Sequence, residues 1–120
     1  MTESAELEIR DDEYRVRYNS ETQTVTFQGE LQLNGMEEYA PIVMLLDKVV
    51  NQEPSVLTLD LRKLEFLNSS GINVLLSLVI KVRNKQTIQL VVEGSETVSW
   101  QSRSLNNIRR LMPTAQLNIA

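Results

Sequence analysis

The segment from Ser55 to Lys85 constrains the fold most, because its hydrophobic pattern changes period at two adjacent serines. Before the serines, "SVLTLDL" is nearly continuous in apolar residues, which predicts a central strand that is covered on both faces or lies deep in a sheet. After the serines, "GINVLLSLVIKVRNK" leaves a single polar stripe at Asn73, Ser77 and Lys81, which predicts a well-buried helix. A buried strand that leads into a buried helix is typical of α/β proteins.

The other patterns predict strands that alternate with helices. The runs "YRVRYN" and "TVTFQGELQL" alternate apolar and polar residues across a short polar break, as a hairpin does. Pro41 is tolerated only in the first turn of a helix, so the first helix is expected to begin at 37–40. Leu64 and Phe66, in the connector after the central strand, are expected to pack under the domain. The expected strands are 14–19, 24–33, 55–61, 87–94 and 115–119, and the expected helices are 37–50, 71–85 and 102–112.

This order predicts the fold class and the domain organisation. We expect an α/β single domain over residues 14–120, with a mixed sheet of about five strands, an N-terminal hairpin and three to four helices. Residues 1–13 carry six acids and one base, whereas the whole chain has a formal charge of -4. We interpret residues 1–13 as a solvated acidic leader. The alternative is that Leu7 and Ile9, which alternate with polar residues, extend the first strand.

Composition excludes several classes of function. The chain has no cysteine and no histidine, so disulfides, thiolate metal sites, cysteine nucleophiles and a Ser-His-Asp triad are excluded. No glycine-rich phosphate loop is present. The near-neutral body gives no broad electrostatic footprint for nucleic acid, and no run of 18 apolar residues predicts a membrane span. We therefore predict no enzyme, no metal, no cofactor, no nucleic acid and no membrane association.

The sequence Asn68-Ser69-Ser70-Gly71 stands where the strand pattern gives way to the helix pattern. In the simpler interpretation, Asn68 or Ser69 caps the helix, which stabilises it by about 1 kcal/mol, and Ser70 is only exposed. In the other interpretation, a hydroxyl is a phosphorylation site. Phosphate adds a charge of about -1.5 to -2, which the positive end of a helix accepts. Gly71 would leave room at the backbone for a kinase or a phosphate.

The segment "VLTLDLRKLEFLNSSGINVLL" resembles the signature of STAS domains, which include the bacterial anti-sigma factor antagonists. The matching features are an apolar strand that ends in an aspartate, a short linker with an aromatic residue, and two serines and a glycine that open a helix. The predicted order of elements also matches from about residue 14 to 119. The matching residues are Asp60, Phe66, Ser69, Ser70 and Gly71.

The resemblance implies a cytoplasmic partner-switching regulator without catalysis of its own, either monomeric or weakly dimeric. Its unmodified form would bind an anti-sigma factor that is also a serine kinase. The kinase would phosphorylate Ser70, with Ser69 as the second choice, and a PP2C-type phosphatase would reverse the modification. An alternative within the same family is a small-ligand or lipid-sensing STAS module, without phosphoregulation, that has a pocket beneath the same edge.

Several residues around the motif are candidates for supporting roles. Asn68 replaces the usual aspartate of the motif, so a kinase that reads that carboxylate would act slowly or not at all. Asn34 and Gly35, in the loop before the first helix, are expected at the same edge as the serines and would contact a partner. Asp60 would orient the serine hydroxyls or serve as a plain turn residue. Trp100 would be an exposed binding anchor or would pack against the last helix.

Overall fold

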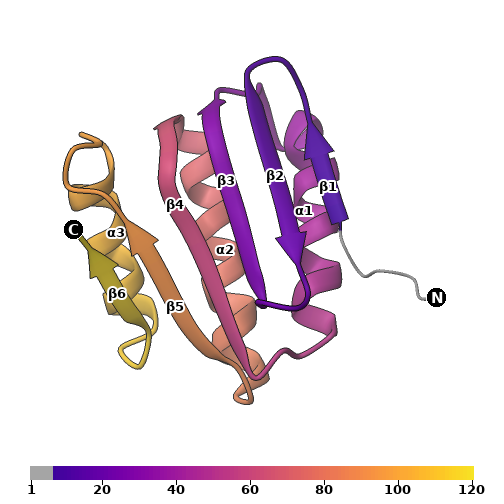
Figure 1. Cartoon of the computed structure of the whole chain (residues 1–120), viewed down its shortest axis with the longest axis vertical. Helices are drawn as coiled ribbons and strands as arrows, with labels where there is room; N and C mark the ends of the chain where they lie inside the picture. Colours follow the sequence, from indigo (N-terminus) through magenta and orange to yellow (C-terminus); the bar gives the residue numbers. More distant parts are fainter. Residues whose placement is uncertain (1–6) are drawn as a thin grey trace.

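A computed structural model describes residues 7–120, which fold as a six-stranded sheet with three helices (Figure 1). The predicted α/β class and mixed sheet are confirmed, with one strand more than expected. In chain order the elements are β1 (Leu7–Arg10), β2 (Tyr14–Asn19), β3 (Thr24–Leu31), α1 (Gly35–Asn51), β4 (Val56–Leu67), α2 (Ser69–Lys85), β5 (Gln89–Gly94), α3 (Gln101–Leu111) and β6 (Gln116–Ile119).

The order of strands in the sheet is the order in the chain, from β1 to β6. The pairs β1–β2 and β2–β3 are antiparallel, and the pairs from β3 to β6 are parallel. Each parallel pair is joined by one helix, and each crossover moves one position in the same direction. Because such crossovers are almost always right-handed, all three helices lie on one face of the sheet (Figure 1).

The opposite face of the sheet carries no helix, and β4 shows the consequence. Leu57, Leu59 and Leu61 are fully buried in the core, whereas Thr58 and Asp60 between them are only partly buried. The expectation that this strand is covered on both faces is therefore wrong. Its position deep in the sheet, between β3 and β5, is confirmed. The two polar residues alternate with leucines because side chains of a strand point to opposite faces.

The acidic N-terminal segment contributes a strand. Residues Leu7–Arg10 form β1, and Leu7 and Ile9 lie opposite Tyr18 and Val16 of β2. These residues form a strand of their own, which pairs with β2 and does not extend it. The remaining part of the predicted leader before Leu7, residues 1–6, lies outside the described residues.

Two predicted boundaries are wrong. Helix α1 begins at Gly35, so Pro41 lies inside it, with an exposed side chain on the solvent side where a missing backbone hydrogen bond costs least. Strand β4 continues through the predicted connector to Leu67. Leu64 is buried as expected, but Phe66 is 43% exposed. A bulge explains the difference, because Leu64 pairs with Gly29 and Phe66 with the next residue of β3, which leaves one extra residue between them on β4.

Candidate functional site

The candidate site lies where the ends of β3 and β4 lead into α1 and α2. The backbone N–H of Asn68 donates to the carbonyl of Leu31 at 3.1 Å, and its side-chain Nδ2 donates to the carbonyl of Leu33 at 2.8 Å. These bonds join the loop after β4 to the loop after β3. The structure thus brings Asn34 and Gly35 to the same edge as the two serines.

Asn68 is the N-cap residue of α2. Its Oδ1 accepts a hydrogen bond from the backbone N–H of Gly71 at 3.0 Å and another from the hydroxyl of Tyr39 at 2.7 Å. Of the two residues proposed as the cap, the structure selects Asn68 and leaves Ser69 inside the first turn. An aspartate at this position could accept the same two bonds, but as a carboxylate it could not donate to Leu33. Asparagine at position 68 therefore makes three side-chain hydrogen bonds, whereas an aspartate could make only two of them.

Tyr39 is a supporting residue that the sequence analysis assigned only to the helical core. Its side chain is 1% exposed, and its hydroxyl lies 3.2 Å from the carbonyl of Leu31 as well as 2.7 Å from Asn68. Burial raises the pKa of Tyr39, so the hydroxyl stays protonated and remains a donor. A tyrosine where leucine or isoleucine would fill the core is the signal that could have indicated this role, because a buried tyrosine hydroxyl needs a partner.

Ser69 and Ser70 are the first two residues of α2. Ser69 is exposed and Ser70 is partly buried, and within residues 7–120 neither hydroxyl forms a hydrogen bond. Their backbone N–H groups precede the hydrogen-bonded turns of the helix and have no partner within it. The first turn of α2 contains no acidic residue. The serines therefore stand at a helix end whose positive dipole is not neutralised by an acidic side chain of its own first turn.

Gly71 serves packing rather than access. It is buried, and a Cβ atom built on it would lie 2.6 Å from the hydroxyl of Tyr39 and would also collide with the side chain of Leu67. The expectation that this glycine leaves room for a kinase or a phosphate is therefore wrong. The side chains of Tyr39 and Leu67 fill the space beside Gly71. Because Gly71 has no side chain, the start of α2 can approach the end of β4 closely.

Asp60 does not contact the serines. It lies in the middle of β4, and its carboxylate accepts hydrogen bonds from Nε and Nη2 of Arg62 at 3.0 and 2.9 Å. These bonds lower the pKa of Asp60. The proposed role in orienting the hydroxyls is not supported, and Asp60 is a strand residue rather than a turn residue.

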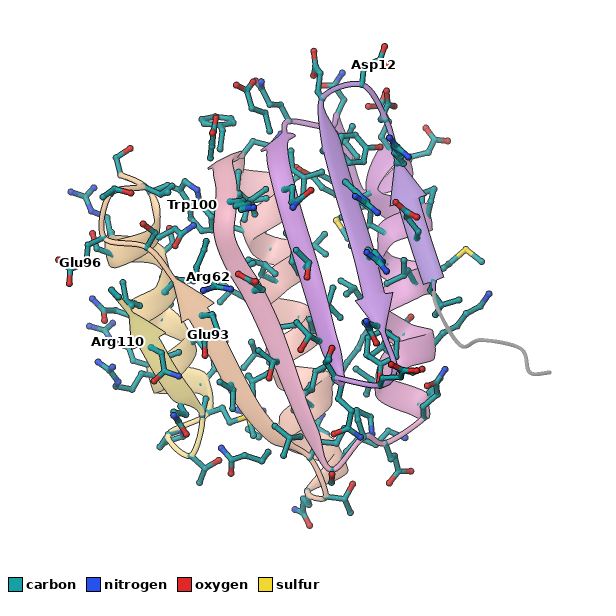
Figure 2. All side chains as sticks on the ribbon, in the orientation of Figure 1. Asp12, Arg62, Glu93, Glu96, Trp100 and Arg110 are labelled. Carbon is teal, nitrogen blue, oxygen red and sulfur yellow. The ribbon has the colours of Figure 1, made fainter. Side chains whose placement is uncertain are left out.

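Trp100 also lies outside the serine edge. Its indole Nε1 donates to the carbonyl of Leu64 at 2.9 Å, and its side chain is partly buried against the core at the start of α3. Figure 2 shows it on the side of the sheet that carries β5 and α3. The structure supports the packed alternative, because the indole holds the bulged part of β4 against the start of the last helix.

The described residues offer few other kinds of site. Within residues 7–120, no three acidic, histidine or cysteine side chains gather as metal ligands would. None of the three described helices combines the length and the hydrophobicity needed to cross a membrane. Five surface hollows within residues 7–120 are lined by residues other than Asn68 and the two serines. An apolar ligand cavity beneath the serine edge is not among them.

Solved structures with the same fold include SiaC and an anti-sigma factor antagonist. SiaC of Pseudomonas aeruginosa matches with a TM-score of 0.66 at 15% identity, over 97% of this chain and 96% of that chain. A structure of the diguanylate cyclase SiaD in complex with its activator SiaC matches with a TM-score of 0.69 at 14% identity, over 94% and 97%. An anti-sigma factor antagonist from Mycobacterium paratuberculosis matches with a TM-score of 0.59 at 23% identity, over 97% and 86%. At these identities the likeness shows the shared fold.

The sequence itself identifies the family. A comparison with curated proteins gave no significant match. The family model of the STAS domain, however, matches residues 17–101, which include β3, α1, β4, the two serines and α2. That match covers more than two thirds of the 120 residues and contains the segment on which the resemblance was based. This chain belongs to the STAS domain family.

Proposed function

We propose that this protein is a non-catalytic partner-switching regulator, an anti-sigma factor antagonist that acts in the cytoplasm. It binds an anti-sigma factor that is also a serine kinase, and phosphorylation of Ser70 by that kinase ends the binding. A PP2C-type phosphatase restores the unmodified form. The observation that carries this proposal is the start of α2, where two hydroxyls without hydrogen bonds lie in a first turn that has no acidic side chain.

The geometry favours a modification that changes the surface and preserves the fold. The cap of α2 is Asn68, so neither serine hydroxyl is needed to start the helix. A phosphate on Ser70 would lie near the free N–H groups of the first turn, which accept negative charge. The added charge would then face a partner rather than disturb the core, as a reversible switch requires.

Exposed apolar side chains near the same edge favour a protein as the ligand. Met36, in the first turn of α1, is 54% exposed, and Phe66, two residues before Asn68, is 43% exposed. Large apolar side chains that stay exposed beside polar loops are common at protein–protein contacts. We assign Asn34, Gly35, Asn68, Ser69, Ser70 and Gly71 to this edge, with Met36 and Phe66 as its apolar contacts and Gly71 as its packing residue.

One structural neighbour suggests a second class of partner. SiaC is described as the activator of the diguanylate cyclase SiaD, and the match to the structure of their complex covers 94% of this chain. A protein of this fold can therefore act on an enzyme rather than on an anti-sigma factor. The same edge and the same serine would serve that partner, so the two candidates differ in the partner and not in the site.

The test is to incubate the protein with the cognate anti-sigma factor kinase and ATP, and to locate the phosphate by mass spectrometry. We expect one phosphate on Ser70, no phosphate in the Ser70→Ala variant, and normal modification of Ser77→Ala. Ser77 is the matched control because it is an exposed serine on the same helix, two turns further on. Phosphate on Ser69 alone, or none at all, would contradict the proposal.

A further variant examines the replaced aspartate. If the kinase reads a carboxylate at position 68, Asn68→Asp should be phosphorylated faster than the wild-type protein. If the kinase reads only the serine and the helix end, the two rates should agree within about a factor of two. A partner that binds the unmodified protein and is a diguanylate cyclase would support the second candidate instead.

A further inference from the structure

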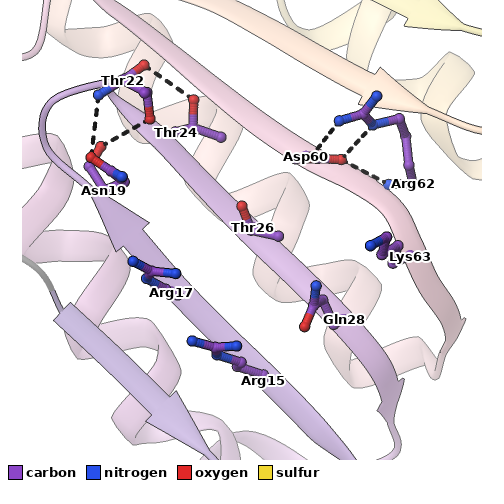
Figure 3. A pocket seen from close by; sticks show the side chains of 10 residues that line it. All are labelled: Arg15, Arg17, Asn19, Thr22, Thr24, Thr26, Gln28, Asp60, Arg62 and Lys63. Carbon is purple, nitrogen blue, oxygen red and sulfur yellow. Dashed lines mark hydrogen bonds and ion pairs between the residues drawn. The ribbon is translucent and has the colours of Figure 1, made fainter.

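The helix-free face of the sheet carries a shallow hollow of about 490 Å³ (Figure 3). Its lining combines polar side chains of β2, β3 and β4, and it lies on the face opposite the helices. Neither Ser69 nor Ser70 lines it, and none of Asn34, Gly35 and Asn68 does. The hollow is therefore separate from the edge to which we assign partner switching.

The register of the three strands gives the hollow a floor and two walls. Arg17, Thr26 and Asp60 lie opposite one another in one row, and Arg15, Gln28 and Lys63 lie opposite one another in the next. The shorter side chains stand on the middle strand, β3, and the longer cations stand on β2 and β4 on either side (Figure 3). Side chains of alternate residues share a face, so this arrangement forms a trough along β3.

The charge of the lining is opposite to the charge of the whole chain. The lining contains four cations, Arg15, Arg17, Arg62 and Lys63, and one anion, Asp60, whereas the whole chain has a formal charge of -4. Arg15 pairs with Glu8 of β1, and Arg62 pairs with Asp60. Lys63 is exposed and has no ion-pair partner within residues 7–120. Even with these two ion pairs the cations of the trough outnumber the acids beside them, so the trough is a local cationic surface that favours an anionic ligand.

We propose that this trough binds an acidic, extended segment of a partner protein. From Thr24 to Gln28 the floor spans roughly 13 Å at about 3.3 Å per residue, the length of about five residues of extended peptide. The Thr26 hydroxyl and the Gln28 side-chain amide can donate to its backbone or its carboxylates, whereas the hydroxyls of Thr22 and Thr24 already donate to carbonyls of the turn between β2 and β3. Arg15 and Lys63 on the two walls supply charge-assisted hydrogen bonds.

Other anionic ligands fit the trough less well. No aromatic side chain lines it, whereas sites for single-stranded nucleic acid combine cations with aromatic stacking surfaces. The negative charge of the whole chain also opposes a long polyanion. The cations are distributed along two strands and do not converge on one point, as a site for a single phosphate would require.

The test uses NMR titration of the isotope-labelled protein with an octaglutamate peptide, in low salt and then with added salt. We expect saturable shifts at the amides of Thr24, Thr26 and Gln28, which weaken as salt is added. The Arg15→Gln/Lys63→Gln variant should bind at least about fivefold more weakly. The matched control is Arg109→Gln/Arg110→Gln, which removes two exposed cations from the end of α3 and should stay within about twofold of the wild type.

The outcomes separate this proposal from its competitors. Equal weakening by the two double variants, or shifts that avoid β3, would overturn it. A single-stranded thymidine octamer that binds more tightly than the peptide would indicate a nucleic-acid site instead. Because the shifts are measured on the wild-type protein, the result stands even if the variant unfolds. Ser70→Glu should leave peptide binding unchanged, since the trough is separate from the serine edge.

Discussion

The two helix starts at the serine edge, those of α1 and α2, are built in opposite ways. Helix α1 follows Asn34, whose side chain makes no capping bond, and carries Glu37 and Glu38 in its first turn. Helix α2 follows Asn68, whose side chain caps it, and carries no acid in its first turn. The first helix has its own negative charges at its positive end, and the second has two hydroxyls there.

This difference indicates which helix start can act as a switch. In α1 the carboxylate of Glu38 accepts a hydrogen bond from the backbone N–H of Asn34 at 2.9 Å, so one free donor is already satisfied. Added charge there would meet two acids. In α2 the cap is internal to the fold, and the first turn of this helix offers the added charge N–H groups and hydroxyls but no acid. In α2, therefore, Asn68 caps the helix, and the two serines are the residues that can receive an added charge.

The largest expected effect comes from the two glycines near these helix starts. Gly71→Ala should lower the free energy of unfolding by about 3 kcal/mol, because its Cβ would collide with Tyr39 and Leu67. Gly35→Ala should cost only about 1 kcal/mol, because Gly35 has a φ of +70° but no atom within 4 Å of an added Cβ. Urea unfolding of both variants checks this, and equal losses would contradict the packing role of Gly71.

The second-largest change in the free energy of unfolding is expected for substitutions of the two asparagines that precede these helices. Asn68→Ala should cost about 2 kcal/mol, because it removes the cap and the donor to the Leu33 carbonyl, and leaves the Tyr39 hydroxyl only its longer contact with the Leu31 carbonyl. Asn34→Ala should cost less than about 0.5 kcal/mol, because its side chain makes no capping bond. Thermal and urea unfolding give both values. A loss at Asn34 as large as that at Asn68 would remove the contrast between the two helix starts.

A smaller effect is expected for Asn68→Asp. The carboxylate can still accept from Gly71 and Tyr39, but it loses the donated bond to Leu33 and places two oxygens against each other. We expect a loss of about 1 kcal/mol at neutral pH, between the wild type and Asn68→Ala. Urea unfolding at pH 7 measures it. A variant more stable than the wild type would mean that the Leu33 contact contributes little.

The smallest effect is expected for new charge in the first turns. Ser70→Glu should change the free energy of unfolding by less than about 0.5 kcal/mol, and in the stabilising direction, because it adds a negative charge at the positive end of α2. Met36→Glu is the matched change at the second position of α1, where Glu37 and Glu38 already supply negative charge, so we expect it to stabilise the protein less than Ser70→Glu does. The reverse order of the two variants would contradict the electrostatic contrast.

The sequence was sufficient for the order of elements and for the place of the motif. Alternation in 14–19 and 24–33 and helical spacing after Gly71 correspond to β2, β3 and α2. It was insufficient where distant segments decide the outcome. The strand Leu7–Arg10 has only four residues and depends on pairing with β2. The bulge that exposes Phe66 depends on the register of β4 against β3.

The limits at the site have the same physical origin. The type of residue at position 68 indicated a cap, but its third partner, the Leu33 carbonyl, belongs to a loop 35 residues earlier in the chain. The glycine in the motif suggested room for a partner, whereas its neighbours Leu67 and Tyr39 show that the room is filled. Local pattern predicts which residues start a helix. Only the packed neighbours show what each of them contacts.

The central claim is that negative charge on Ser70 ends partner binding without unfolding the protein. The most direct measurement is calorimetric titration of the cognate partner with protein that carries phosphoserine at position 70, beside the unmodified protein and the Ser77→Glu control. We predict that phosphoserine weakens binding at least about 100-fold, a difference of about 2.7 kcal/mol, with an unchanged unfolding temperature. Equal affinity of the phosphorylated and unmodified forms, in proteins that are both folded, would contradict the account.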